Sequence, residues 1–119
     1  ELAGFVIPLC ATIHLSGSTM KIVACAMAIM LMSGLDIHFG QFAGFILMLG
    51  IAMVAAPGVP GGAIMAALGL LQSMLGFDET AQGLMIALYI AMDSFGTATN
   101  VTGDGAIAVI VNKIYGKDK

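Results

Sequence analysis

A run of 41 residues without a formal charge separates Asp36 from Asp78, and His38 is the sole titratable group within it. Soluble domains carry about 25% charged residues, whereas 9% of this chain is charged and 60% is hydrophobic. Such a chain has too little polar surface to cover itself in water. The sequence therefore predicts an all-α membrane protein.

The composition also excludes several functional classes. The net charge of −3, with no basic patch to neutralise phosphates, argues against nucleic acid as a partner. No nucleophile–base pair, metal-ligand cluster or phosphate loop is present in the sequence, so neither an enzyme nor a cofactor is predicted. Cys10 and Cys25 lie in apolar stretches without CxxC spacing, which favours buried thiols. The first ten residues do not have the features of a signal peptide.

Breaks in the apolar pattern divide the first two thirds of the chain. Residues 1–33 are interrupted by HLSGS at 14–18, where Ser and Gly lower helix propensity, so we expect a broken transmembrane helix that restarts at about Thr19. Residues 41–75 form two apolar arms of about fifteen residues each, and a spanning helix needs about 20. The join, APGVPGG, predicts a re-entrant helical hairpin, with one long proline-kinked helix as the alternative.

The last apolar block, 81–115, predicts one long final transmembrane helix, with Thr80 as its cap. Within it, polar residues recur at i, i+4, i+7 and i+11, which places them on one helix face: Asp93, Thr97, Asn100 and Asp104. A polar stripe in an apolar helix indicates a binding site. Lysines 113, 117 and 119 follow the stripe, so the C-terminus is predicted to be cytoplasmic.

The oxygen atoms of the stripe suit a small hard cation and a small polar solute. Asp104 with Asn100 is expected to hold the cation, helped by freed backbone carbonyls of the unwound step. Asp93 with Thr97 is expected to hold an amino group and oxygen atoms of the solute.

Each of these residues also has a structural interpretation. For Asp93 and Asp104 it is the less favoured alternative: Asp93 as a helix N-cap, and Asp104 as a residue of a solvated turn. His14 is expected to be a hydrogen-bonded polar residue, with proton carriage as its alternative role. Lys21 is expected to extend its ammonium toward the membrane surface.

Three motifs together resemble one known family. The sequence NVTGD at 100–104, preceded by Asp93 and Thr97, resembles the last-helix signature of the dicarboxylate/amino-acid:cation symporters, the glutamate-transporter homologues. FVIPLCATIHLSGS at 5–18 resembles the seventh-helix segment of that family, and APGVPGGAIM at 56–65 resembles the tip of its second hairpin. The order and spacing of the three motifs match, and they cover nearly the whole chain.

The resemblance implies sodium-coupled symport of a small amino acid or dicarboxylate by an elevator motion, with the full-length protein a homotrimer among lipids of a bacterial inner membrane. The implied substrate residues are Asp93 for the ammonium, Thr97 and Asn100 for polar oxygens, the backbone near Val59 and Gly62, and Ser18 and Gly96. One sodium is implied at Asp104 and Asn100, with backbone oxygens of Cys10 and His14. A second is implied between backbone oxygens of Thr12, Met53, Val54 and Ala56.

The sequence departs from the pattern of the family at two places. Gly96 stands where carriers of acidic amino acids often have arginine, so a neutral amino acid fits this helix as well as glutamate does. HLSGS at 14–18 replaces the usual Asn-Met-Asp-Gly-Thr, which predicts fewer coupled sodium ions and a proton in partial replacement at His14.

The resemblance covers only the C-terminal part of the family. Its scaffold helices and first hairpin have no counterpart in these 119 residues, so the chain is expected to be a fragment of a longer protein. The runner-up function is a small membrane subunit, or a non-transporting fragment, whose polar stripe packs helices together.

Overall fold

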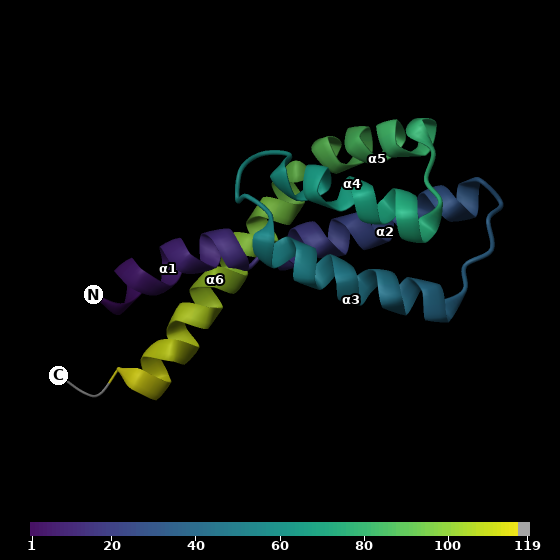
Figure 1. Ribbon diagram of the computed structural model, residues 1–119. Coiled ribbons are helices and arrows are strands. Elements are labelled where there is room, and N and C mark those ends of the chain that lie inside the picture. The colour runs from purple at the N-terminus through teal and green to yellow at the C-terminus, as the bar shows by residue number, and fades with distance from the viewer. Residues whose placement is uncertain (117–119) are drawn as a thin grey trace.

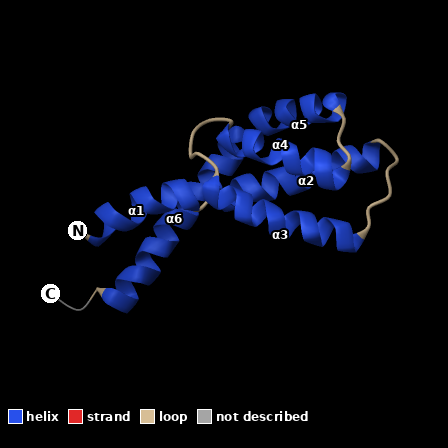
Figure 2. Cartoon of the chain, in the orientation of Figure 1, coloured by secondary structure: helices blue, strands red, loops and turns tan. Residues whose placement is uncertain are grey.

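The computed structural model describes residues 1–116, which are helical throughout apart from short connections, and no strand occurs among them. The helices are α1 (Leu2–Ile13), α2 (Ser16–Met32), α3 (Phe39–Ala55), α4 (Gly62–Leu75), α5 (Glu79–Ala91) and α6 (Asp93–Tyr115). Helices α2 to α5 lie alongside one another, whereas α1 and α6 leave this bundle at one end, where both termini lie (Figure 1). The predicted all-helical class is confirmed (Figure 2).

Apolar side chains from four helices fill the centre of the bundle. The largest fully buried ones are Phe45, Ile22, Leu49, Ile64, Leu71 and Met85. Phe42 meets the ring of Phe45 edge-on, with the ring centroids 5.8 Å apart. In a bilayer, where lipid is as apolar as these side chains, close packing rather than removal from water holds the helices together.

The break between α1 and α2 is shorter than predicted. Only His14 and Leu15 leave the helical conformation, and α2 begins at Ser16 rather than at about Thr19. The amide of Gly17 donates to the side-chain oxygen of Asn100 at 2.8 Å, so a residue of α6 satisfies a backbone group that the start of a helix leaves unpaired. The segment Leu2–Met32 is long and apolar enough to cross a membrane.

Helices α3 and α4 form the predicted helical hairpin rather than one kinked helix, and residues 56–61 make its tip. Ala56 is extended, with ψ 137°, as a residue before proline prefers. Gly61 has φ +77°, a left-handed conformation that glycine adopts without strain. A Cβ at Gly58 would meet the carbonyl oxygen of Ala11, so the tip packs directly on the last turn of α1.

The prediction of one continuous final helix over 81–115 is wrong in one respect, because α5 and α6 meet at Met92 with a bend of 62°. Helix α5 packs on α2 and α4, whereas α6 crosses α2 and continues along α1, and one straight helix could not follow both paths. The polar periodicity in the sequence runs through the break and hides it. Taken as one span, the bent pair is also long and apolar enough to cross a membrane.

The sequence-based assignment of Thr80 as a helix cap is wrong. Asp78, not Thr80, caps α5, since its carboxylate accepts the amide of Ala81 at 2.8 Å. Asp93 is the first residue of α6 and Met92 is the cap residue, so the alternative of Asp93 as an N-cap is excluded.

The crossing of α2 and α6 depends on the missing side chain of Gly17. A Cβ there would lie 2.7 Å from the Cβ of Thr99 and would also meet the carbonyl oxygen of Gly96. We expect Gly17→Ala to lower the free energy of unfolding by about 1–3 kcal/mol, because overpacking forces the two backbones apart. Thermal unfolding of the detergent-solubilised native polypeptide measures the change.

Gly105→Ala is the matched control, since nothing lies within 4 Å of a Cβ at that position. Equal unfolding midpoints for the two variants would contradict the tight crossing.

Candidate functional site

A cleft of about 330 Å³ lies between the hairpin tip and α6, with further walls from α1, α2 and α5. Six residues that the sequence predicted for the site line it: Ser18, Val59, Asp93, Thr97, Asn100 and Asp104. The polar stripe therefore occupies one face of α6, as its spacing predicted. The fold brings that face opposite the hairpin tip and close to the break between α1 and α2.

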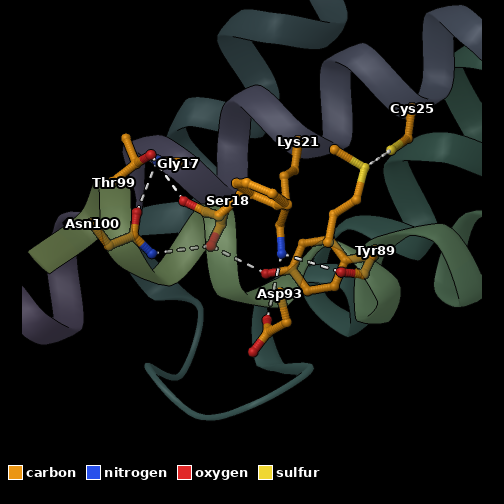
Figure 3. Close-up of polar contacts among 10 residues, drawn as sticks. Gly17, Ser18, Lys21, Cys25, Tyr89, Asp93, Thr99 and Asn100 are labelled. Carbon is orange, nitrogen blue, oxygen red and sulfur yellow. Dashed lines mark hydrogen bonds and ion pairs between the residues drawn. The ribbon is translucent and has the colours of Figure 1, made fainter.

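Asn100 is fixed by hydrogen bonds to the first turn of α2. Its Oδ1 accepts the amide of Gly17 at 2.8 Å, and its Nδ2 donates to the hydroxyl of Ser18 at 3.2 Å. The hydroxyl of Tyr89 donates to the same Ser18 oxygen at 3.1 Å (Figure 3). An amide oxygen has two lone pairs and an amide nitrogen two protons. Asn100 thus keeps one acceptor and one donor position for a ligand in the cleft.

Asp104 is buried and pairs with His14, whose Nδ1 lies 2.8 Å from the Asp104 Oδ1. The ring of His14 lies against α6 at Gly103, where a Cβ would collide with it. His14 is therefore hydrogen-bonded, as expected, and Asp104 is not in a solvated turn. The second carboxylate oxygen of Asp104 remains available as a cation ligand.

Lys21 does not extend toward the membrane surface, and that prediction is wrong. Only 5% of the residue is exposed, and its Nζ donates to the carbonyl oxygen of Tyr89 at 3.2 Å. The same nitrogen lies 3.4 Å from Asp93 Oδ1 and 3.6 Å from the centroid of the Tyr89 ring (Figure 3).

The observed start of α2 explains the inward position of Lys21. A helix starting at Thr19 would put Lys21 at a helix end, where a long side chain can reach the membrane surface. With α2 starting at Ser16, Ser18 and Lys21 are at i and i+3 and share one face, which turns toward α5 and α6.

Two predicted substrate residues lie outside the cleft. Gly96 is buried behind it, and a Cβ there would lie 2.7 Å from the Cε of Lys21, so the bare position makes room for the lysine stem. Gly62 is buried at the start of α4, where a Cβ would meet the carbonyl oxygen of Pro57. The missing side chain of Gly62 thus leaves room for Pro57, which lines the cleft, and that of Gly96 leaves room for Lys21.

The backbone groups predicted for sodium lie around the contact between α1 and the hairpin tip. The carbonyl of Cys10 accepts the amide of His14 at 2.7 Å, and the hydroxyl of Thr12 donates to the carbonyl of Leu9 at 2.8 Å. Met53 near the end of α3 and Ala56 at the start of the tip are buried, whereas Val54 is exposed. The packing of Gly58 on α1 brings the two segments together, and the sodium ligands themselves stay predictions.

The sodium:dicarboxylate symporter family model matches residues 1–114. Excitatory amino acid transporter 3 of Mus musculus is 32% identical over 118 residues, which is 99% of this chain and 22% of the relative. Excitatory amino acid transporter 5 of Homo sapiens is 31% identical over 118 residues, 99% of this chain and 21% of the relative. The chain therefore spans about a fifth of the length of these curated relatives. No solved structure matches it significantly.

Loss of the Asn100 side chain would leave the Gly17 amide without its partner. We expect Asn100→Ala to lower the free energy of unfolding by about 1–3 kcal/mol, because a buried donor loses its acceptor. Asn112→Ala is the matched control, since Asn112 is exposed near the end of α6. Thermal unfolding in detergent compares the two variants. An Asn100→Ala protein as stable as the control would show that the hydrogen bond between Gly17 and Asn100 contributes nothing to the free energy of unfolding.

Proposed function

The chain belongs to the sodium:dicarboxylate symporter family, and we propose that the polypeptide carrying it moves a small amino acid or a dicarboxylate across a membrane together with sodium. The family is one of transporters rather than enzymes. One observation carries the proposal: the polar stripe of α6, the hairpin tip and the break between α1 and α2 converge on a single cleft. Discontinuous helices around a polar centre are what membrane transporters use to bind ions and solutes.

The cleft offers a means of coupling cation binding to solute binding. Asp104 and Asn100 supply oxygen ligands for one cation, while Thr97 and Asn100 supply polar groups to the solute. The hairpin tip, through backbone groups near Val59 and Gly62, closes over the solute. If the tip closes well only when cation and solute are both bound, each raises the affinity of the other.

The ion sites follow the family resemblance. We assign the first sodium to Asp104 and Asn100 with backbone oxygens of Cys10 and His14. The second lies between the backbone oxygens of Thr12, Met53, Val54 and Ala56. The contact of Gly58 with Ala11 supports the second site, because it holds the tip against the end of α1.

The same resemblance assigns the ammonium of an amino-acid solute to Asp93. The ammonium of Lys21 already lies 3.4 Å from that carboxylate. A solute ammonium bound there would therefore share Asp93 with Lys21.

The membrane arrangement is also part of the proposal. Helices α3 and α4 are short apolar helices, which favours a re-entrant hairpin with its tip at membrane depth. The whole protein is proposed to be a lipid-embedded homotrimer of a bacterial inner membrane that works by an elevator motion. A cytoplasmic C-terminus stays a prediction from Lys113, since Lys117 and Lys119 lie outside the described residues.

The runner-up is a membrane subunit that transports nothing. It is supported by the bonds of Asn100 and Asp93 to α2, because polar contacts of this kind can pack membrane helices together. Sodium dependence separates the two functions, since helix packing alone requires no ion.

Sodium-driven uptake into proteoliposomes by the native polypeptide, with labelled L-aspartate and succinate, tests the proposal. We expect uptake to need an inward sodium gradient. Replacing one carboxylate ligand weakens the cation site, so Asp104→Asn should raise the sodium concentration for half-maximal uptake about tenfold or more.

Asp78→Asn is the matched control, because Asp78 is exposed and asparagine caps a helix equally well. An unchanged sodium dependence in Asp104→Asn would remove Asp104 from the cation site, and uptake without sodium would refute the symport.

The number of coupled sodium ions gives a separate prediction. His14 replaces an amide of the usual family step and binds one oxygen of Asp104, which leaves fewer oxygen ligands for cations. We expect fewer than three sodium ions per solute. Net flux reverses at a membrane potential set by this ratio, so reversal potentials measured over a range of sodium gradients determine it. A ratio of three would contradict the prediction.

A further inference from the structure

Lys21 is a charged residue near the middle of an apolar span. The segment Leu2–Met32 is 31 residues long, and Lys21 lies four residues beyond its midpoint, which is about 6 Å along a helix axis at 1.5 Å per residue. Only 5% of the residue is exposed. An ammonium at this depth is expensive unless the chain itself supplies a partner.

Within residues 1–116, three groups surround that ammonium, and one of them is an anion. The carbonyl oxygen of Tyr89 accepts a hydrogen bond at 3.2 Å, and the face of the Tyr89 ring lies 3.6 Å away. The Oδ1 of Asp93, at 3.4 Å, is the negative charge. A carboxylate, a carbonyl and an aromatic face are together a complete environment for a buried cation.

Lys21 reaches this position from behind the cleft. Tyr89 and Asp93 both line the cleft, whereas Lys21 lines a separate hollow beside Gly96 and Thr99. The absent side chain of Gly96 makes the approach possible, since a Cβ there would lie within 3.1 Å of the lysine Cδ, Cε and Nζ. The side chain of Asp93 is 44% exposed, so the same carboxylate is held by Lys21 and still accessible to a solute.

We propose that Lys21 is a built-in counter-charge for Asp93, which makes the site select carboxylate solutes that lack a cationic amino group. This inference rests on the proposed function and narrows its substrate class to dicarboxylates. A solute ammonium would meet a carboxylate that Lys21 has already neutralised, and it would be repelled by the lysine charge. A solute carboxylate would meet a neutral pair instead of a bare anion. Lys21 acts through Asp93 and is a positioning residue.

Succinate and L-aspartate form a matched pair of probes, because aspartate is succinate with one added amino group. Binding of each to the purified native polypeptide is measured by calorimetry with and without sodium, alongside uptake in proteoliposomes. We expect the wild type to bind succinate more tightly than aspartate. We expect Lys21→Met, which keeps the volume of the stem and removes the charge, to shift the ratio of the two dissociation constants about tenfold toward aspartate.

Two further variants separate charge from packing. Lys21→Arg keeps the positive charge and should keep the preference for succinate. Lys113→Met is the control for the same substitution at an exposed position in the last turn of α6, and it should leave the ratio unchanged.

Two outcomes would overturn the inference alone. The first is a wild type that prefers aspartate, a result that needs no variant. The second is an unaltered ratio of the two dissociation constants in Lys21→Met, including an equal loss of both solutes, because a merely structural role would move both affinities together. Tight, sodium-independent binding with the expected ratio would support the role of Lys21 and refute the sodium coupling. If neither solute bound the wild type, the proposed function and the inference would fall together.

Discussion

The structure depends on the hydrogen bond from the Gly17 amide to the side chain of Asn100. A helix that is interrupted inside an apolar medium has backbone groups with no water to bind, so its break persists only where the protein supplies partners. Asn100 supplies one from α6, at 2.8 Å. Because Gly17 and Gly96 carry no side chains, α2 and α6 come close enough for this bond to form. The break between α1 and α2 therefore depends on the close crossing of α2 and α6. The cleft lies beside this crossing and depends on it too.

Polar residues in this chain have two functions at once. Each charged or amide group of the stripe that faces α1 or α2 is paired: Asn100 with Gly17 and Ser18, Asp93 with Lys21, and Asp104 with His14. These pairs hold the helices together, and in the proposed site they also set the charge that a ligand would meet. A pair that is already neutral gives less attraction to a solute cation than a bare carboxylate does. The packing of the helices and the selectivity of the proposed site are thus coupled.

The hairpin has a packed base and an exposed tip. Phe45 of α3 and Leu71 of α4 are fully buried in the bundle, whereas residues 57–60 of the tip are exposed. Few side-chain contacts restrain the tip, and its contact with α1 is through backbone at Gly58. Segments with few buried apolar contacts have low local stability and supply the parts of a protein that move. This distribution is consistent with a tip that closes over a solute while the base stays in place.

The sequence alone determined the helical class, the hairpin and the composition of the site. The 41 uncharged residues required an apolar surrounding, the prolines and glycines of 57–62 required a turn, and the spacing of Asp93, Thr97, Asn100 and Asp104 put them on one face. These features are local, and local periodicity and backbone preference are what a single sequence encodes directly. The motifs at 5–18, 56–65 and 100–104 also sufficed to identify the family.

Only the tertiary structure decided which of these groups meet. The 62° bend at Met92 arises because α5 packs along α2 and α4, whereas α6 crosses α2 and continues along α1. The inward position of Lys21 arises because Gly96 leaves a space 75 residues further along the chain. The pairing of His14 with Asp104 joins residues 90 positions apart. Contacts at such separations depend on how whole helices cross, and no local pattern specifies that crossing.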